Sequence, residues 1–138
     1  MGYTRVLAGI EAFLDEVPQL RGDWETHLQD YDEPLPHVFF GSDVCRFAVS
    51  VAESDDDGAV ARFSAAIERL SESNDPDIQN IIHVSFAENL VWGDEREQRA
   101  LARLRPGFGP ETEMRFREFE AWAAEAARYD FKRDVPKP

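Results

Sequence analysis

Two acids and a histidine near the start of the chain have the spacing of one helical face. Asp23, His27 and Asp30 stand at i, i+4 and i+7, and carboxylate and imidazole groups arranged in this way can bind a metal ion. The sequence lacks the Glu-x-x-His pairs that hold di-iron centres in helical bundles. A solvated polar helix face explains the three residues more simply, so we expect neither a metal site nor a cofactor.

The single cysteine is the other candidate for chemistry. Cys45 falls on or beside the inner stripe of its predicted helix, where a thiol is usually buried and inert. A Cys–His pair would need His37 or His83 close by, and no third group that would orient the histidine is evident. Gly-x-Ser-x-Gly and phosphate-binding glycine loops are absent. We therefore expect that the protein is not an enzyme.

An acidic turn and two polar helix residues complete the set. The run Asp55-Asp56-Asp57-Gly58 has the composition of a calcium loop without its alternating ligands or closing glutamate, and it indicates a helix-capping turn. Glu88 and Asn80 fall among apolar residues on a helical wheel. They are either buried polar anchors or residues of a groove, and the anchor is favoured because buried polar groups are usually satisfied internally.

Length and composition indicate one globular domain over residues 1–138. The chain is 43% hydrophobic and 12% aromatic, and no apolar run approaches the roughly 20 residues of a membrane span. Its first residues meet acids early, unlike a secretory signal. The lone cysteine suits a reducing compartment, so we expect a cytoplasmic protein.

The charge is strongly acidic and unevenly distributed. The net charge is −13, and residues 1–58 carry 13 acids against three arginines, whereas residues 59–138 carry 15 acids against 12 bases. Nucleic acids and anionic membranes are disfavoured as partners, because both bind mainly to Lys and Arg. The acidity either serves solubility or forms a face for a basic partner, and such a face would lie in the first half.

One predicted helix organises the others. Asp75-Pro76 predicts its start and Gly93-Asp94 its end, and its apolar residues spread nearly all round the wheel, which is typical of a buried helix. Helical periodicity predicts six more helices, at about residues 4–17, 23–32, 43–52, 59–73, 94–105 and 110–129. We expect His37–Phe40 to form a loop that packs on the core, and residues 130–138 to form a frayed tail.

The predicted fold is therefore all-α. About seven helices, joined by short links, would form antiparallel hairpins stacked as a compact bundle or as a short HEAT-like array.

Residues 35–92 resemble a family of small, uncharacterised, all-helical bacterial domains. The shared features are an acidic or polar turn between two helices, an aromatic-then-Ile-Glu helix, and a helix of the form Asn-x-Ile-x-Val-Ser-Phe-x-Glu-x-Leu. The residues at those last positions are Asn80, Ile82, Val84, Ser85, Phe86, Glu88 and Leu90. Such proteins are similar in size, charge and helical content to immunity proteins that neutralise bacterial toxins, and the resemblance implies no catalytic residue.

These observations favour a binding protein of immunity type that neutralises a basic toxin or effector. A helical adaptor or structural domain without a toxin is the alternative, and an enzyme is the third. The predicted contact residues form two acidic patches, on the second helix and at the turn before the fourth. They are Asp23, Trp24, Glu25, Asp30, Asp32 and Glu33, followed by Glu53, Asp55, Asp56 and Asp57.

Overall fold

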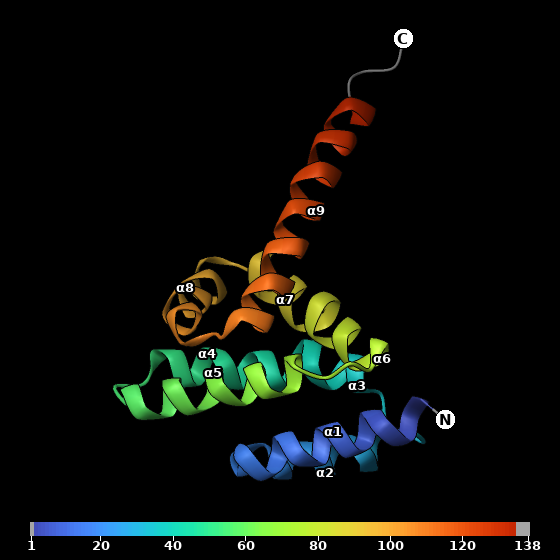
Figure 1. The fold of residues 1–138 in the computed structure, drawn as a ribbon, viewed down its shortest axis with the longest axis vertical. Coiled ribbons are helices and arrows are strands. Elements are labelled where there is room, and N and C mark those ends of the chain that lie inside the picture. Colours follow the sequence, from blue (N-terminus) through green and yellow to red (C-terminus); the bar gives the residue numbers. More distant parts are fainter. Residues whose placement is uncertain (1, 135–138) are drawn as a thin grey trace.

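The computed structural model describes the backbone of residues 2–134 and the side chains of residues 4–128. Within these limits the chain forms seven continuous helical segments and no strand, which confirms the all-α prediction (Figure 1). Two of the seven each contain an internal π-helical turn. The segments are α1 (Gly2–Glu16), α2 (Arg21–Asp30), α3–α4 (Pro36–Phe39 and Cys45–Glu53), α5 (Asp57–Ser71), α6–α7 (Pro76–Asn80 and Ala87–Val91), α8 (Glu95–Leu104) and α9 (Pro110–Asp134).

The segment α6–α7 is the buried helix that the sequence predicts. Asp75 caps it by accepting a hydrogen bond from the Asp77 backbone N–H at 2.9 Å, and Pro76 is its first residue. A π-helical turn over Ile81–Phe86 joins its two halves. A π turn contains an extra residue and so rotates the faces of a helix. The consecutive residues Ser85–Ala87 are consequently all buried, whereas Val84 is 37% exposed.

Five phenylalanine rings connect this helix to its neighbours. Phe86 lies 6.2 Å from Phe63 of α5 and 6.0 Å from Phe116 of α9, measured between ring centroids. Phe13 of α1 lies 6.3 Å from Phe63 and 5.4 Å from Phe40, which belongs to the π turn before α4. Because each of the five side chains is at most 2% exposed, they form one continuous core across five helical segments.

The structure corrects the prediction of a loop at His37–Phe40. Pro36 begins α3, a position that proline favours, and a π turn over Phe40–Val44 carries the helix directly into α4. The prediction that this helix begins at about residue 43 is therefore wrong. The Ser42 hydroxyl instead donates to the Val38 carbonyl at 2.9 Å, within the helix.

The last two helices begin with distinct caps. Asp94 and Glu97 have the spacing of a capping box and form one at the start of α8. The α9 N-terminus is capped from another helix, because Glu68 of α5 accepts hydrogen bonds from the backbone N–H groups of Glu111 and Thr112 at 3.1 and 2.9 Å. The prediction that α9 ends near residue 129 is wrong, since the helix continues to Asp134. The rest of the predicted frayed tail, residues 135–138, lies outside the described residues.

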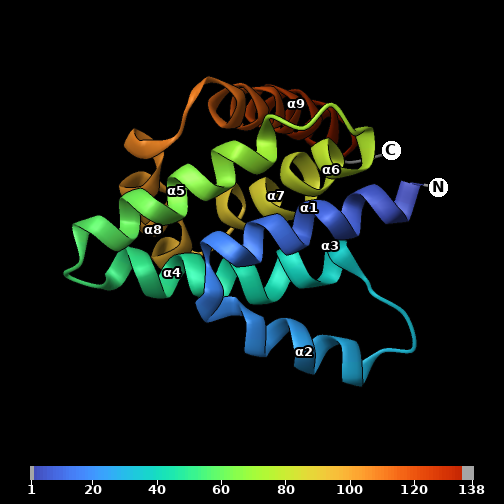
Figure 2. The ribbon, with the colours of Figure 1, turned by 60° about the horizontal axis from the view of Figure 1, so that its bottom comes forward.

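The helices pack as a compact bundle. Joined by a short turn, α4 and α5 lie side by side, α8 packs against α4, and α1 lies across α5 and α6 (Figures 1 and 2). Two segments lie at the periphery. One is α2, at the outer edge of the bundle in Figure 2, and the other is the C-terminal half of α9, which projects beyond the bundle in Figure 1.

Candidate binding surface

The peripheral helix α2 is attached through one aromatic face. Trp24 stacks on His27 with 5.3 Å between ring centroids and meets Phe39 of α3 edge-on at 4.8 Å. His27 is 4% exposed, and its Nε2 accepts a hydrogen bond from the Leu35 backbone N–H at 3.0 Å. These contacts fix both the rotation of α2 and the path of the link that follows it, so the opposite side of α2 faces solvent.

This arrangement separates the three residues at metal-ligand spacing. His27 is buried and uses Nε2 for the link, whereas Asp23 and Asp30 are exposed, and no cluster of three possible metal ligands occurs among the described residues. The structure therefore does not bring Asp23, His27 and Asp30 together as one set of ligands.

Acidification is expected to weaken the contacts that hold α2 and the link after it against the bundle. Burial lowers the pKa of His27 below its ordinary 6.5, against an opposing effect of Asp43 and Asp30, and protonated Nε2 could not accept the Leu35 N–H. The unfolded chain then binds the proton more readily than the folded chain does, so this contribution to stability is complete above pH 6.5 and is lost as the pH falls toward the lowered pKa.

Hydrogen exchange at the Leu35 amide, measured from pH 8 to pH 5, tests this expectation. The measured rates are first corrected for the pH dependence of the intrinsic exchange rate, so that only the protection of the amide is compared. Protection should fall below about pH 6.5 relative to amides of the central helix. Protection that stays constant relative to those amides would contradict it. His27→Gln serves as the control, because its exchange should lack this pH dependence.

The outer side of α2 and its exit carry five carboxylates. All five are exposed, and no described arginine lies within ion-pair distance of any of them. Two large apolar side chains, Leu28 at 40% and Tyr31 at 41% exposed, lie among them. We call this set the α2 surface, and it consists of Asp23, Glu25, Leu28, Asp30, Tyr31, Asp32 and Glu33.

Trp24 does not belong to the α2 surface, and the prediction that it contacts a partner needs correction. Its side chain is 5% exposed and packs against His27 and Phe39, which leaves no free face for a partner. Leu28 stands four residues after Trp24, a spacing that predicts the same inner side of the helix, but its side chain is 40% exposed. The large apolar residues available on α2 are therefore Leu28 and Tyr31.

The second predicted patch, the turn from Glu53 to Asp57, is largely neutralised. Arginines from later helices pair with three of its four acids. Arg96 donates to Glu53 at 2.6 Å, Arg103 donates to Asp57 at 2.7 Å, and Arg62 lies 3.8 Å from Asp56. Asp56 also caps α5 through the Ala59 backbone N–H at 2.9 Å. The turn therefore has the helix-capping role that its composition predicts, with Asp55 as its one acid unpaired among the described side chains.

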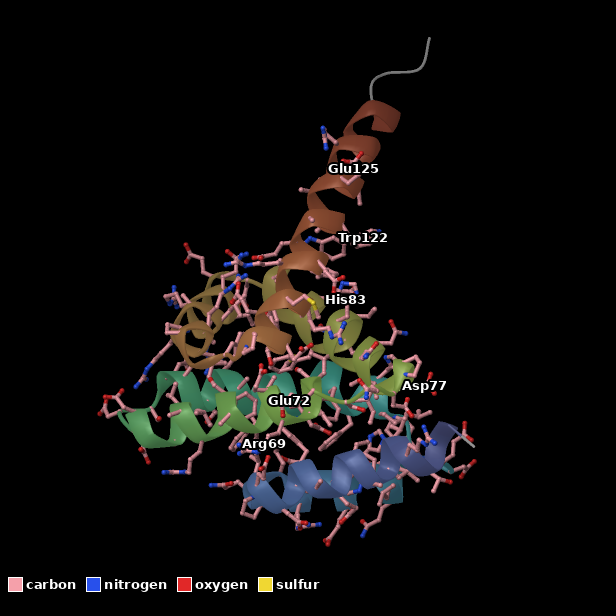
Figure 3. The ribbon with its side chains drawn as sticks, viewed as in Figure 1. Arg69, Glu72, Asp77, His83, Trp122 and Glu125 are labelled. Atoms are coloured by element: carbon pink, nitrogen blue, oxygen red, sulfur yellow. The ribbon has the colours of Figure 1, made fainter. Side chains whose placement is uncertain are left out.

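Most of the other acids in the first half are paired as well. Arg21 binds Glu11 and Asp15, Arg69 of α5 binds Glu16 of α1, and Arg46 binds Asp43. Arg69 lies on the side of α5 that faces α1 in Figure 3. A count of charges along the sequence does not show these pairs, and the pairs of Arg69 with Glu16, Arg96 with Glu53 and Arg103 with Asp57 each join residues more than 40 positions apart. Their effect is to concentrate the unpaired negative charge of residues 1–58 on the α2 surface.

No Cys–His pair forms in the described part of the chain. The Cys45 thiol is buried, donates to the Phe40 carbonyl at 3.2 Å, and has its pKa raised to about 12 by that burial. His37 Nδ1 instead lies 2.6 Å from the Ser85 hydroxyl oxygen, and His83 packs edge-on against Phe119 with 6.0 Å between centroids. Cys45 is accordingly a core residue, as its position in the helical pattern suggests.

Glu88 and Asn80 are not buried anchors. Glu88 is half-buried and forms no ion pair or hydrogen bond with a described side chain, and Asn80 is exposed. The π turn explains the difference, because it rotates the helix relative to the regular wheel on which both residues seemed enclosed. The expectation that Glu88 is a paired interior group is therefore wrong.

The fold and its surfaces define a small, acidic, all-helical protein in which the five carboxylates of the α2 surface have no ion-pair partner among the described side chains. Among the described residues, no helix is both long enough and apolar enough to cross a membrane. The chain belongs to the family described as a domain of unknown function, DUF7674, whose model matches residues 10–122. No curated protein and no solved structure was found to match the chain.

Proposed function

We propose that this protein is a binding protein of immunity type, which neutralises a basic toxin or effector protein through the α2 surface. One observation carries the proposal: five exposed carboxylates without a described ion-pair partner, together with the exposed Leu28 and Tyr31, lie on α2 and its exit. A surface that served solubility alone would need neither the clustering of unpaired charge along one segment nor the two large apolar side chains.

The two kinds of residue have separate roles in this proposal. Unpaired carboxylates of one sign attract a basic protein over a distance and speed the encounter. Affinity then requires anchors that lose water in the complex, and tyrosine is among the residues most enriched at such positions. An apolar centre with a charged rim is the usual anatomy of a protein interface.

The proposal also defines the setting of the protein. The partner is a basic protein rather than a nucleic acid or a membrane, because the exposed surface of α2 would repel phosphate groups. The protein acts in the cytoplasm, without a cofactor and without catalysis of its own. Immunity function is a finer assignment than binding, and it rests on the resemblance in size, charge and helical content described above.

Co-expression separates immunity from adaptor function. The basic protein that co-purifies with the tagged chain would be expressed in cells alone and together with this chain. The proposal predicts that the partner alone stops growth and that the wild-type chain restores it. The double variant Leu28→Ala with Tyr31→Ala should restore growth poorly. Its fold should persist, because both side chains are exposed, so the loss would report on binding. A partner without toxicity would favour the adaptor instead.

A further inference from the structure

A half-open cavity lies between α1 and the helices α5 and α6. Its volume is about 490 Å³, and small-molecule sites usually measure roughly 300–1,000 Å³. One face of α1 forms the first wall, and residues of α5, of α6 and of the link between them form the second. We call this space the α1 cavity, and its apolar lining consists mainly of Ala8, Gly9, Ala12, Phe13, Leu70 and Ile78.

Small residues of α1 leave this space open. Gly9 brings α1 against α6, because a Cβ at this position would lie 2.9 Å from Ile78 Cδ1. Ala8 and Ala12 line the cavity and remain exposed, since their methyl groups are too short to fill the space beside that contact. The same face of α1 extends from Arg5 to a glutamate eleven positions later, about 16 Å along the helix. The cavity is therefore elongated.

Arg5 stands at this cavity without a carboxylate partner. Every other arginine among the described side chains forms an ion pair, whereas Arg5 is exposed and forms none with them. Arg5 is thus an exception in a chain with 28 acids and 15 bases. The acids of the lining have other partners, because Glu16 pairs with Arg69, and Asp75 accepts the Asp77 N–H at 2.9 Å.

We propose that the α1 cavity binds a free alkyl carboxylate, with the alkyl chain along α1 and the carboxylate on Arg5. A guanidinium group can donate two parallel hydrogen bonds to one carboxylate. The lining favours an alkyl chain over an aromatic ring, because the exposed apolar groups, Ala8 and Ala12, are aliphatic. Phe13, the aromatic residue of the lining, is 2% exposed and offers no free ring face.

The net charge of the protein is compatible with this ligand. A charge of −13 repels an anion at a distance, but salt screens that repulsion over a Debye length of about 8 Å. The adjacent charge of Arg5 therefore dominates once the ligand lies in the cavity. None of the residues of the α2 surface lines the α1 cavity, so this proposal does not depend on the function proposed above.

An NMR titration of the full chain with decanoate tests the proposal, because the amide shifts report both the dissociation constant and the place of binding. We expect saturable shifts at Gly9 and Ala12, with a Kd below about 1 mM. Octanoate should bind roughly tenfold more weakly, because it buries two fewer methylenes. Decanol lacks the charge and should bind about fivefold more weakly than decanoate.

Two substitutions separate the charge of the cavity from its space. Arg5→Gln should weaken decanoate binding about fivefold and leave decanol binding unchanged. Ala12→Leu occupies the cavity and should abolish the saturable shifts with both ligands. The matched controls lie on α8, outside the lining. They are Arg99→Gln, which removes the same charge from a side chain that is 70% exposed, and Ala102→Leu, at an exposed position. Both should bind decanoate like the wild type.

The absence of saturable shifts at Gly9 and Ala12 with decanoate up to about 5 mM would overturn the proposal. An Arg5→Gln variant that binds decanoate as tightly as the wild type would also overturn it, as would equal affinities of the wild type for decanoate and decanol. Circular dichroism establishes that the variants are folded. Should Ala12→Leu not fold, Arg5→Gln still decides the question, because Arg5 is exposed and its removal breaks no described ion pair.

Discussion

Replacing Phe86 with alanine is expected to lower the free energy of unfolding by about 3–5 kcal/mol, the usual cost of removing a fully buried phenylalanine. Phe86 is 0% exposed and contacts the rings of Phe63 and Phe116, so the cavity would open where the central helix, α5 and α9 meet. Urea unfolding followed by circular dichroism measures the change through the shift in midpoint.

Val84→Ala is the matched control for Phe86→Ala. Val84 lies in the same π turn but is 37% exposed, so its loss should change the free energy of unfolding by about 1 kcal/mol or less. Equal effects of the two substitutions would contradict the assignment of α6–α7 as the central buried helix.

Removing the Arg105 guanidinium is expected to have the second largest effect on stability, about 2 kcal/mol at neutral pH. Arg105 follows α8 and donates to two carboxylates of α9, to Glu113 at 2.9 Å and to Glu120 at 2.7 Å. It also lies 5.9 Å from the centroid of the Phe116 ring. Arg105→Gln would leave two half-buried carboxylates without this partner.

The pH dependence of stability tests whether the hydrogen bonds of Arg105 are the source of this stabilisation. Hydrogen bonds from Arg105, supported by Arg117, lower the pKa of Glu113 from its ordinary 4.5 to about 2. The resulting stabilisation is complete above pH 4.5 and is lost as the pH falls from 4.5 to about 2. Arg105→Gln should flatten the stability profile over this interval.

Arg117→Gln is the comparison for Arg105→Gln. The Arg117 side chain is 76% exposed and bonds Glu113 alone, whereas that of Arg105 is 27% exposed and bonds two acids. The Arg117 variant should therefore keep most of the wild-type slope. If the Arg105 and Arg117 variants gave the same profile, the interhelical cluster would not be the source of the dependence.

Local signals in the sequence predict the elements of this fold well. Asp75-Pro76 predicts the start of the central helix, and Asp94 with Glu97 predicts the capping box of α8, because both features depend on residues close together in the chain. The buried position of Phe86 follows from the apolar character of its helix. The prediction fails at His37–Phe40, where Pro36 begins a helix rather than breaking one and a π turn over Phe40–Val44 carries that helix directly into α4.

The candidate binding surface could be predicted only in outline. The charge count predicts an excess of acid in the first half, and the five carboxylates of the α2 surface are among the predicted contact residues. The arginines that neutralise the turn before α5 come from α8 and from within α5, and their pairing depends on packing that sequence distance conceals. The orientation of α2 about its own axis could not be predicted from the sequence either, because the contact between Trp24 and Phe39 determines it.

The central claim is that the unpaired acids of the α2 surface attract a basic partner. Its most direct test is the association rate with the co-purified basic protein, at low and high salt, for two variants that each remove three negative charges. One combines Asp30→Asn, Asp32→Asn and Glu33→Gln. The other combines Glu53→Gln, Asp55→Asn and Asp57→Asn, and spares Asp56 because it caps α5.

The two variants have the same net charge, so a difference between them reports the location of the contact. We expect the α2 variant to associate about tenfold more slowly than the wild type at low salt, with the difference shrinking as salt screens the charges. The variant of the turn should associate at nearly the wild-type rate. Equal rates for both variants, or a wild-type rate that is indifferent to salt, would contradict the claim and leave the charge as a device for solubility.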